Sequence, residues 1–490
     1  MSRILIVILC FVCHVRIGLA ADDLQVGAAE VDITPPNGFP MAGYYHERLA
    51  TGAIDRLKAK AIVFRQGSLQ AALVVNDLTG ISIDLTTAVR QRASKLTGIP
   101  ASNIVLSATH SHTAPEYYLS VYQLLQGEKS ARAQPERLQY AENLIQSISD
   151  SIVAAHKSLA SVKVFSGSAT QTTPVSFNRR FVMRDGSVRT WMNYENKEVV
   201  RAAGPIDPEI GLVALRASDT NQPLAVLSNF ALHLDTVGGT RWSADYPFFV
   251  EQELRSELGS GLISVFGTGC CGDINHADPN RRERNKTDFI GGSLGKTIRG
   301  SVKDLPALTS DRLTFQQRTV QLPLQEFSGT EVPRAAGVLQ AVKDGTKVDF
   351  LEQVTAYKIA MVDMLRNQTP STNLTGLINW GISKQWSGIG SHLPVEVQTL
   401  SIGDDLAIVC LPGEVFVDLG LAIKRASPYR TTLVIELCTC VETVYIPTRA
   451  ACAGGSYEVT NSTVKPGSGE MLVEAAIELL RESRARRSSP

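Results

Sequence analysis

The sequence predicts an α/β protein: one large domain of mixed β-sheets covered by helices, with its functional site at the carboxyl ends of strands. Two patterns indicate this fold class. Short apolar stretches of strand length recur along the chain, and segments with the three-to-four residue periodicity of amphipathic helices lie between many of them. Strands that are apolar on both faces are typical of sheets that helices cover. With 490 residues, 44% of them hydrophobic, the chain can bury a large core.

The expected elements follow one another along most of the chain. The apolar stretches predict strands at residues 61–65, 71–77, 104–108, 162–167, 212–217, 223–233, 261–267, 406–411 and 431–437. The helical patterns predict helices at residues 84–98, 137–160 and 245–259, a helical elaboration at 325–380 and a final helix at 469–487. The stretch "GGSLGKT" resembles a phosphate-binding loop, but that motif needs glycine where Ile290 stands, so a helix is predicted there instead.

The N-terminal stretch indicates where the protein is located, and the overall charge indicates which classes of partner it can bind. Residues 1–20 combine a basic start, a short apolar run and small residues, which predicts a signal peptide and a secreted or periplasmic protein. After its removal no stretch is long enough to span a membrane. Residues 21–490 are then expected to form a single domain. Lys+Arg and Asp+Glu number 48 each, so the total charge gives no indication of a nucleic-acid partner. The oligomeric state and the pairing of the six remaining cysteines stay open.

The stretch "LSATHSHTAP" contains the first candidate site. Side chains two apart on a strand share a face, so His110 and His112 can both point out of the carboxyl end of the strand at 104–108. In α/β proteins, ligands bind at that edge of a sheet. Imidazole is a good zinc ligand. A zinc site and a pair of hydrogen-bonded histidines closing a buried strand are both compatible with this pattern.

Other strand ends carry polar side chains that could share the same rim. His233 ends the stretch 223–233, and a glycine-rich loop after 261–267 carries Asp273, Asn275 and His276. Glu414 lies in a Pro-Gly turn after 406–411, where it could also cap the following helix. Several polar strand ends together predict a candidate active site more strongly than any one of them.

Eight motifs resemble, in order, the neutral/alkaline non-lysosomal ceramidase family, and in particular its N-terminal catalytic domain. They are "VGAAEVDITPP", "THSHTAP", "FNRR", "FALH", "GCCGD", "LPGE", "VYIPTR" and "GGSYE", and they extend over nearly the whole chain after residue 20. The resemblance implies a zinc-dependent amidohydrolase with one zinc per chain. In this family, attack of zinc hydroxide on the amide of an N-acyl sphingolipid releases a fatty acid, so a small-molecule or lipid amide is the expected partner.

The resemblance also assigns roles to individual residues. The implied zinc ligands are His110, His233, Glu414 and Tyr445. The residues implied to act on the substrate are His112, which would face the scissile amide, and Arg179 and Tyr457, which would bind near its carbonyl. Asp273 is a candidate to support them, with a structural loop cap as the alternative.

This chain differs from the family pattern in two ways. Asn275 and His276 stand where the family has serine and proline, and the family serine lies at the active site. The sequence also ends after its last predicted helix, without the β-sandwich domain that follows in full-length family members. Two alternatives therefore stay open: a zinc hydrolase acting on a different amide or ester, and a non-catalytic binding protein that keeps the fold.

Overall fold

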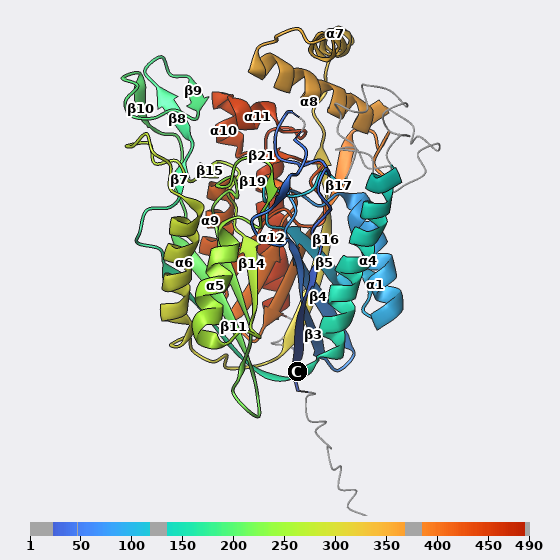
Figure 1. The fold of residues 1–490 in the computed structure, drawn as a ribbon, viewed down its shortest axis with the longest axis vertical. Coiled ribbons are helices and arrows are strands. Elements are labelled where there is room, and N and C mark those ends of the chain that lie inside the picture. The colour runs from blue at the N-terminus through green and yellow to red at the C-terminus, as the bar shows by residue number, and fades with distance from the viewer. Residues whose placement is uncertain (1–22, 47, 118–134, 368–384, 486–490) are drawn as a thin grey trace, which may run out of the picture.

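Two β-sheets pack face to face, and helices cover the outer face of each (Figure 1). The computed structural model describes residues 23–46, 48–117, 135–367 and 385–485. The expected signal peptide at 1–20 lies outside these residues, as do residues 368–380 of the expected elaboration. The mixed α/β class predicted from the sequence is confirmed, and the helices and sheets form four layers.

The first sheet has eight strands in the order β14-β12-β11-β6-β1-β3-β4-β5. Their bounds are β1 Gln25–Asp32, β3 Lys58–Gln66, β4 Leu69–Asn76, β5 Ile104–Ala108, β6 Ala160–Thr170, β11 Glu209–Ala217, β12 Pro223–Phe230 and β14 Ile263–Thr268. The central strands pair antiparallel, and the two parallel pairs, β4 with β5 and β12 with β14, lie at opposite edges. Each parallel pair needs a helical crossover, which α1 and α5 provide.

The second sheet has the order β16-β17-β18-β20. Its strands are β16 Leu313–Pro323, β17 His392–Ile402, β18 Leu406–Cys410 and β20 Thr431–Ile435, and β18 and β20 form a third parallel pair. Residues of both sheets form one apolar cluster, with Ile62 and Leu73 from the first sheet and Leu400, Ile408 and Leu433 from the second. Each such buried aliphatic side chain contributes roughly 1.5–3 kcal/mol to folding.

Three groups of helices cover the outer faces. On the first sheet, α1 Ile83–Thr97 and α4 Pro135–Lys157 cover the half around β3–β5, and α5 Tyr246–Leu258 and α6 Thr287–Val302 cover the half around β11–β14. On the second sheet lie α9 Val417–Ala426 and α12 Ser468–Ala485. The helix predicted over "GGSLGKT" is part of α6.

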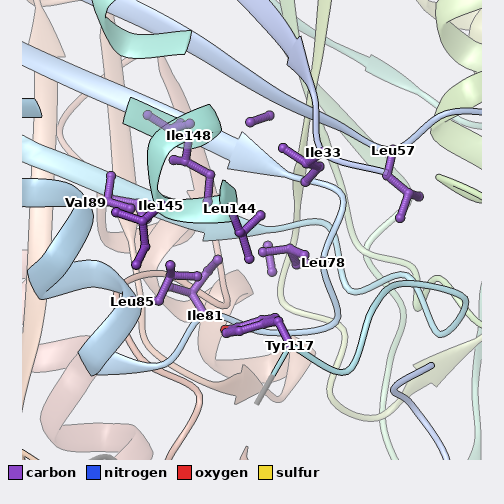
Figure 2. Packing of buried hydrophobic residues seen from close by; sticks show 14 of the residues in the cluster. Ile33, Leu57, Leu78, Ile81, Leu85, Val89, Tyr117, Leu144, Ile145 and Ile148 are labelled. Atoms are coloured by element: carbon purple, nitrogen blue, oxygen red, sulfur yellow. The ribbon is translucent and has the colours of Figure 1, made fainter. Parts of the chain in front are cut away.

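Helix α1 shows how the sequence sets these boundaries. Ser82 accepts a hydrogen bond from the Leu85 amide at the start of the helix, and Gly98 ends it with φ 77°, a left-handed conformation that glycine adopts without strain. Its apolar face, with Leu85 and Val89, packs against Leu144 and other residues of α4 (Figure 2).

Short strands and four further helices gather at one end of the sheets. The helices are α7 Glu331–Lys343, α8 Phe350–Asn367, α10 Arg449–Gly454 and α11 Tyr457–Thr460. The strands are β7 Phe177–Asn178, β8 Arg180–Met183, β9 Val188–Thr190, β10 Val199–Ala202, β15 Ile274–Asn275, β19 Glu414–Val415 and β21 Tyr445–Ile446; β2 Gly52–Ala53 and β13 Arg241–Trp242 form a further short pair. Figure 1 places α7, α8, α10, α11 and β8–β10 together at the top of the molecule.

Sequence patterns located most strands of the two main sheets but missed three of them, and they did not predict the short strands outside these sheets. β1, β16 and β17 were not predicted, and polar side chains such as Gln316 and Gln317 interrupt the apolar pattern of β16, which is an edge strand. Two expected strands are shorter than predicted: β12 ends at Phe230 and β20 at Ile435, because the following residues turn into loops. None of the described helices combines the length and apolar character needed to cross a membrane.

Candidate metal centre

The loops that follow the three parallel strand pairs meet at one edge of the sheets. His110 follows β5, His233 follows β12, and Glu414 begins β19 after the turn that ends β18. β19 pairs in parallel with β21, which places Glu414 opposite Tyr445. The structure thus brings together side chains that lie far apart in the sequence, at the carboxyl edge where α/β proteins place their sites.

Three imidazole rings lie at the centre of this edge. The Nε2 atoms of His110 and His233 are 2.9 Å apart, and Nε2 of His112 lies 3.3 Å from that of His110. The ligand atoms of all three histidines lie within 4.8 Å of one another. Of these three histidines, the resemblance assigned only His110 and His233 to the ligand set, whereas the geometry places His112 in the same cluster.

Backbone carbonyls fix the orientation of two of these rings. Nδ1 of His110 lies 2.6 Å from the Thr79 carbonyl oxygen, and Nδ1 of His233 lies 3.2 Å from that of Cys271. A carbonyl oxygen only accepts, so both Nδ1 atoms carry a proton, and in the neutral form of each ring Nε2 presents a lone pair. Two lone pairs facing each other repel, and a cation between them removes the repulsion. Such carbonyl partners are typical of metal-binding histidines.

Glu414 is buried beside the histidines. Its Oε2 lies 3.3 Å from Nε2 of His110 and 3.6 Å from Nε2 of His233. This oxygen has no hydrogen-bond partner among the described residues. Burial alone would raise the pKa of Glu414, but the adjacent His110 and the positive charge of Arg179 hold it below its usual value. Two imidazoles and a carboxylate with free donor atoms fit a zinc ion, whose bonds to such ligands are about 2.0–2.2 Å long.

The backbone of His110 is held in an unusual conformation. Its φ of 75° lies in the left-handed region, which costs a residue other than glycine about 1–3 kcal/mol. Two hydrogen bonds hold the loop there: Thr109 N donates to Asn76 O at 2.8 Å, and His110 N donates to Leu78 O at 2.9 Å. The loops after β4 and β5 therefore fix the His110 ring in place.

Arg179 links the centre to a second buried carboxylate. Its Nε donates to Glu458 at 2.8 Å, and its Nη2 donates to the Gly272 carbonyl at 2.8 Å and to the Tyr445 hydroxyl at 2.9 Å. Tyr445 lies opposite Glu414 in the β19–β21 pair, and burial together with the Glu414 carboxylate raises the pKa of its hydroxyl. These contacts hold the guanidinium rigidly beside the histidine cluster, and its positive charge is buried there together with the negative charges of two glutamates.

Aromatic side chains lie next to Tyr445. The Tyr457 ring lies 5.8 Å from that of Tyr445 and 4.6 Å from Trp191, and Phe350 stacks on Tyr457 at 6.0 Å. Trp191 and Phe350 are exposed. The four rings form a continuous path from solvent to the buried centre, with Tyr457 half-buried in the middle.

His112 has a carboxylate on its far side. Its Nδ1 lies 3.7 Å from Asp235 Oδ1, which accepts a 2.5 Å hydrogen bond from Tyr44. Burial lowers the pKa of His112 to about 4. Gly43 packs directly on the ring, because a Cβ there would lie 2.8 Å from His112 atoms. Sequence reasoning missed Asp235 and Tyr44; the one available signal was that Asp235 lies two residues after His233.

The glycine-rich loop after β14 contributes mostly structural contacts. Asp273 accepts hydrogen bonds from Asn178 Nδ2 at 2.8 Å and from Val417 N at the start of α9, and its backbone carbonyl accepts from Arg179 N. Burial raises the pKa of Asp273 to about 6. Asp273 thus acts as a loop and helix cap, the alternative considered for it, and it positions Arg179 through the backbone.

Asn275 and His276 lie on the other side of that loop. Asn275 Oδ1 accepts a hydrogen bond from Ala277 N at 3.1 Å. Asn275 also lines a cavity of about 160 Å³ together with Arg179 and Trp191. His276 is buried, and burial lowers its pKa to about 4. Asn275 and Arg179 therefore line the same cavity.

The six described cysteines are free thiols, and five of them are buried. Cys271 donates to Glu436 Oε1 at 3.0 Å, and Glu436 Oε2 accepts from Val415 N at 2.6 Å. Burial raises the pKa of the Glu436 carboxyl well above its usual value. These contacts hold β19 in place through Val415, and they thereby also hold Glu414, the preceding residue.

The fold and the cluster define an α/β protein with a buried imidazole–carboxylate centre suited to a metal ion. Residues 24–242 match the family described as neutral/alkaline non-lysosomal ceramidase, N-terminal. This range contains the three histidines and Arg179, whereas Glu414, Tyr445 and Tyr457 lie beyond it. The sequence resemblance to the ceramidase family is thereby confirmed.

Two solved structures share the fold. The structure of neutral ceramidase from Pseudomonas aeruginosa has a TM-score of 0.66 at 20% identity and covers 94% of this chain and 75% of its own. A ceramidase complexed with C2 has a TM-score of 0.66 at 18% identity and covers 94% of this chain and 76% of its own. No protein with a curated description matches the sequence.

Proposed function

We propose that this chain is a zinc-dependent amidohydrolase that resembles neutral ceramidase and cleaves the amide of an N-acyl lipid. The observation that carries the proposal is the convergence of His110, His233 and Glu414, whose facing donor atoms lie 2.9, 3.3 and 3.6 Å apart. Tyr445 is the proposed fourth ligand because it pairs with Glu414 and its hydroxyl accepts a hydrogen bond from Arg179 beside the histidines. His112 Nε2 faces the same point, but the proton-transfer role proposed for it below requires that it stay outside the ligand set.

One zinc per chain would bind at these donors. Bound zinc supplies Lewis-acid chemistry, lowering the pKa of a water molecule and polarising a carbonyl group. His110 and His233 hold their Nε2 lone pairs toward the centre through their Nδ1 contacts with Thr79 and Cys271. Glu414 offsets part of the positive charge that the centre would gain.

Arg179 and Tyr457 are proposed to bind the substrate carbonyl. Amide hydrolysis passes through a tetrahedral species with a negative oxygen, which fixed hydrogen-bond donors stabilise. Arg179 is held by Glu458 and Gly272 and lines the cavity of about 160 Å³ beside the centre. The Tyr457 hydroxyl is the second donor, and its ring continues the aromatic path along which an acyl chain would lie.

His112 is proposed to move the proton. The leaving amine must gain a proton when the amide bond breaks, and an imidazole within reach of both water and amine can transfer it. Asp235 lies 3.7 Å from Nδ1 of His112 and can orient the ring. Asp273 acts on the site indirectly, because its carbonyl positions Arg179.

A second candidate function keeps the hydrolase and changes the substrate. Asn275 lines the cavity beside Arg179 where the family has a serine, and an amide cannot act as a nucleophile or relay a proton as a hydroxyl does. A different amide or ester is the substrate in this reading. In the remaining alternative, the chain is a binding protein that keeps this fold but does not hydrolyse a substrate.

Residues 21–490 are proposed to form one domain, and a secreted or periplasmic location stays a prediction from residues 1–20. The apolar cluster shared by the two sheets supports the single domain, because it includes residues from Leu24 to Cys438.

The experiment is a hydrolysis panel with the purified chain. N-acylsphingosines in detergent and short soluble N-acyl amines would be incubated with the wild type, His110→Ala and Asn275→Ser, and the released carboxylic acid would be quantified. Turnover of N-acylsphingosine by the wild type, and its loss in His110→Ala, supports the first proposal. Turnover of short amides alone favours the second. Turnover that appears only in Asn275→Ser favours the binding protein.

A further inference from the structure

Lys358 is a buried cation outside the metal centre. It lies in α8 and is 4% exposed. Its one hydrogen-bond contact within the described residues is the Met361 sulfur at 3.9 Å, a weak acceptor, and no ion pair involves it there. An ammonium group without a partner is costly to bury. Burial accordingly lowers the pKa of Lys358 to about 7, and Glu414 opposes this shift.

Lys358 lines a cavity of about 540 Å³ between α8, α11 and the segment after β16. That volume is in the usual range of small-molecule sites, about 300–1,000 Å³. Apolar surface comes from Phe327, Val459, Val464 and Pro466. The cavity therefore combines an apolar lining with a buried amine.

The other charged residues of the cavity already have partners. Glu326 lies 3.6 Å from Arg366 and 3.7 Å from Lys465, so its negative charge is matched by two cations. Lys465 is exposed, whereas Lys358 is not. Lys358 is thus the cation of this cavity that a bound anion would neutralise, and its single charge matches a monoanion. Phosphate groups carry more charge and are usually bound by several donors, often including arginine or backbone amides.

We propose that this cavity binds a monocarboxylate with an apolar chain, whose carboxylate pairs with Lys358 and whose chain contacts Phe327, Val459 and Val464. The carboxylate would convert an unpaired buried cation into a charge-assisted hydrogen bond. Val459 and Thr460 belong to α11, the helix that begins with Tyr457. The occupant therefore contacts the element that carries a proposed substrate-binding residue, while the site itself does not depend on hydrolysis.

The test compares octanoate with octanamide, which has the same chain and no charge, by titration calorimetry at pH 7. The wild type is expected to bind octanoate about tenfold or more tightly than octanamide, the effect of one charge-assisted hydrogen bond. Lys358→Met is expected to lose this preference. Lys465→Met, which removes an exposed cation of the same cavity, is expected to keep it within about twofold.

Two further variants separate this proposal from the metal centre and from misfolding. His110→Ala is expected to keep the preference for octanoate, because the proposed hydrolysis is not involved. Lys358→Gln has a polar side chain without charge and is expected to behave as Lys358→Met does. A wild type without preference, or a preference that survives in both Lys358 variants, would overturn the proposal.

Discussion

The metal centre and the Lys358 cavity both contact α11 and both bury charge, but they do so differently. In the proposed metal centre, Arg179 contacts Glu458 and Tyr445, and each of the proposed ligands His110 and His233 has a carbonyl partner. In the cavity, the one hydrogen-bond contact of Lys358 among the described residues is the Met361 sulfur. The centre is a connected network in which the removal of one member leaves others with fewer partners, whereas Lys358 forms no ion pair within the described part of the chain.

The largest expected effect follows from removing a ligand histidine. His110→Ala and His233→Ala are each expected to lower amide hydrolysis by roughly a thousandfold or more, equivalent to about 4 kcal/mol of barrier. A rate assay on the best substrate of the panel measures this loss. His156→Ala is the control, because His156 lies on α4 and contacts Gln70. Equal hydrolysis rates in His110→Ala and His156→Ala would contradict the proposal that His110 belongs to the active site.

The network predicts a large stability loss when Arg179 is truncated. Arg179→Met leaves Glu458, which is 0% exposed, with a weakened set of partners and should lower the free energy of unfolding by about 3–5 kcal/mol. Urea unfolding measures the change. The double variant Arg179→Met/Glu458→Gln should recover part of the loss, since it removes the buried carboxylate that has lost its Arg179 partner. A single variant as stable as the wild type would show that Glu458 does not depend on Arg179.

Replacement of Lys358 is expected to change the free energy of unfolding in the opposite direction to replacement of Arg179. Lys358→Met should raise the free energy of unfolding by about 1–4 kcal/mol at pH 7, because an unpaired buried charge is replaced by an apolar side chain of similar length. The comparison of the two regions fails if Lys358→Met and Arg179→Met destabilise the fold equally.

The increase in the free energy of unfolding caused by Lys358→Met is expected to depend on pH. The pKa of Lys358 is about 7 in the folded chain and near 10.5 when unfolded, so between these values the unfolded chain binds more protons. Lys358 therefore makes the wild type more stable as pH rises from 7 toward 10.5. The stability advantage of Lys358→Met should shrink over that range. Urea unfolding of both proteins at pH 7 and pH 9 measures it, and an advantage that grows with pH would contradict the assignment.

The smallest effect is expected at the exposed end of the aromatic path. Trp191→Ala should raise KM for a long-chain amide by about tenfold or less and change stability by roughly 0.5 kcal/mol or less, because Trp191 is 47% exposed. Phe289→Ala on α6, also 47% exposed, is the matched control. Equal KM values in the two variants would contradict the proposal that Trp191 contacts the acyl chain of the substrate.

Local sequence patterns located the strand ends but not the contacts between them. His110, His112 and His233 were predicted because each follows an apolar strand, and the structure brings their rings together. Glu414 was ambiguous between a cap and a ligand, and its unpartnered Oε2 favours the ligand. Tyr445 came only from the resemblance, since a tyrosine in a short strand carries no signal of metal binding.

Long-range packing decided what the sequence could not predict. Tyr44 contacts Asp235 across 191 positions of the chain, and no local pattern joins them. Lys358 lies in a predicted helical segment, and nothing in the local sequence indicates that its side chain is buried. Its burial depends on α11 and on the residues after β16, which only the tertiary structure places beside it.

The most direct test of the metal centre is the zinc content of the purified chain, measured by mass spectrometry of the element after dialysis against metal-free buffer. The proposed ligand set predicts about one zinc per chain in the wild type and in His156→Ala, and a small fraction of that in His110→Ala and His233→Ala. A wild-type chain without zinc, or zinc that remains unchanged when either histidine is replaced, would contradict it.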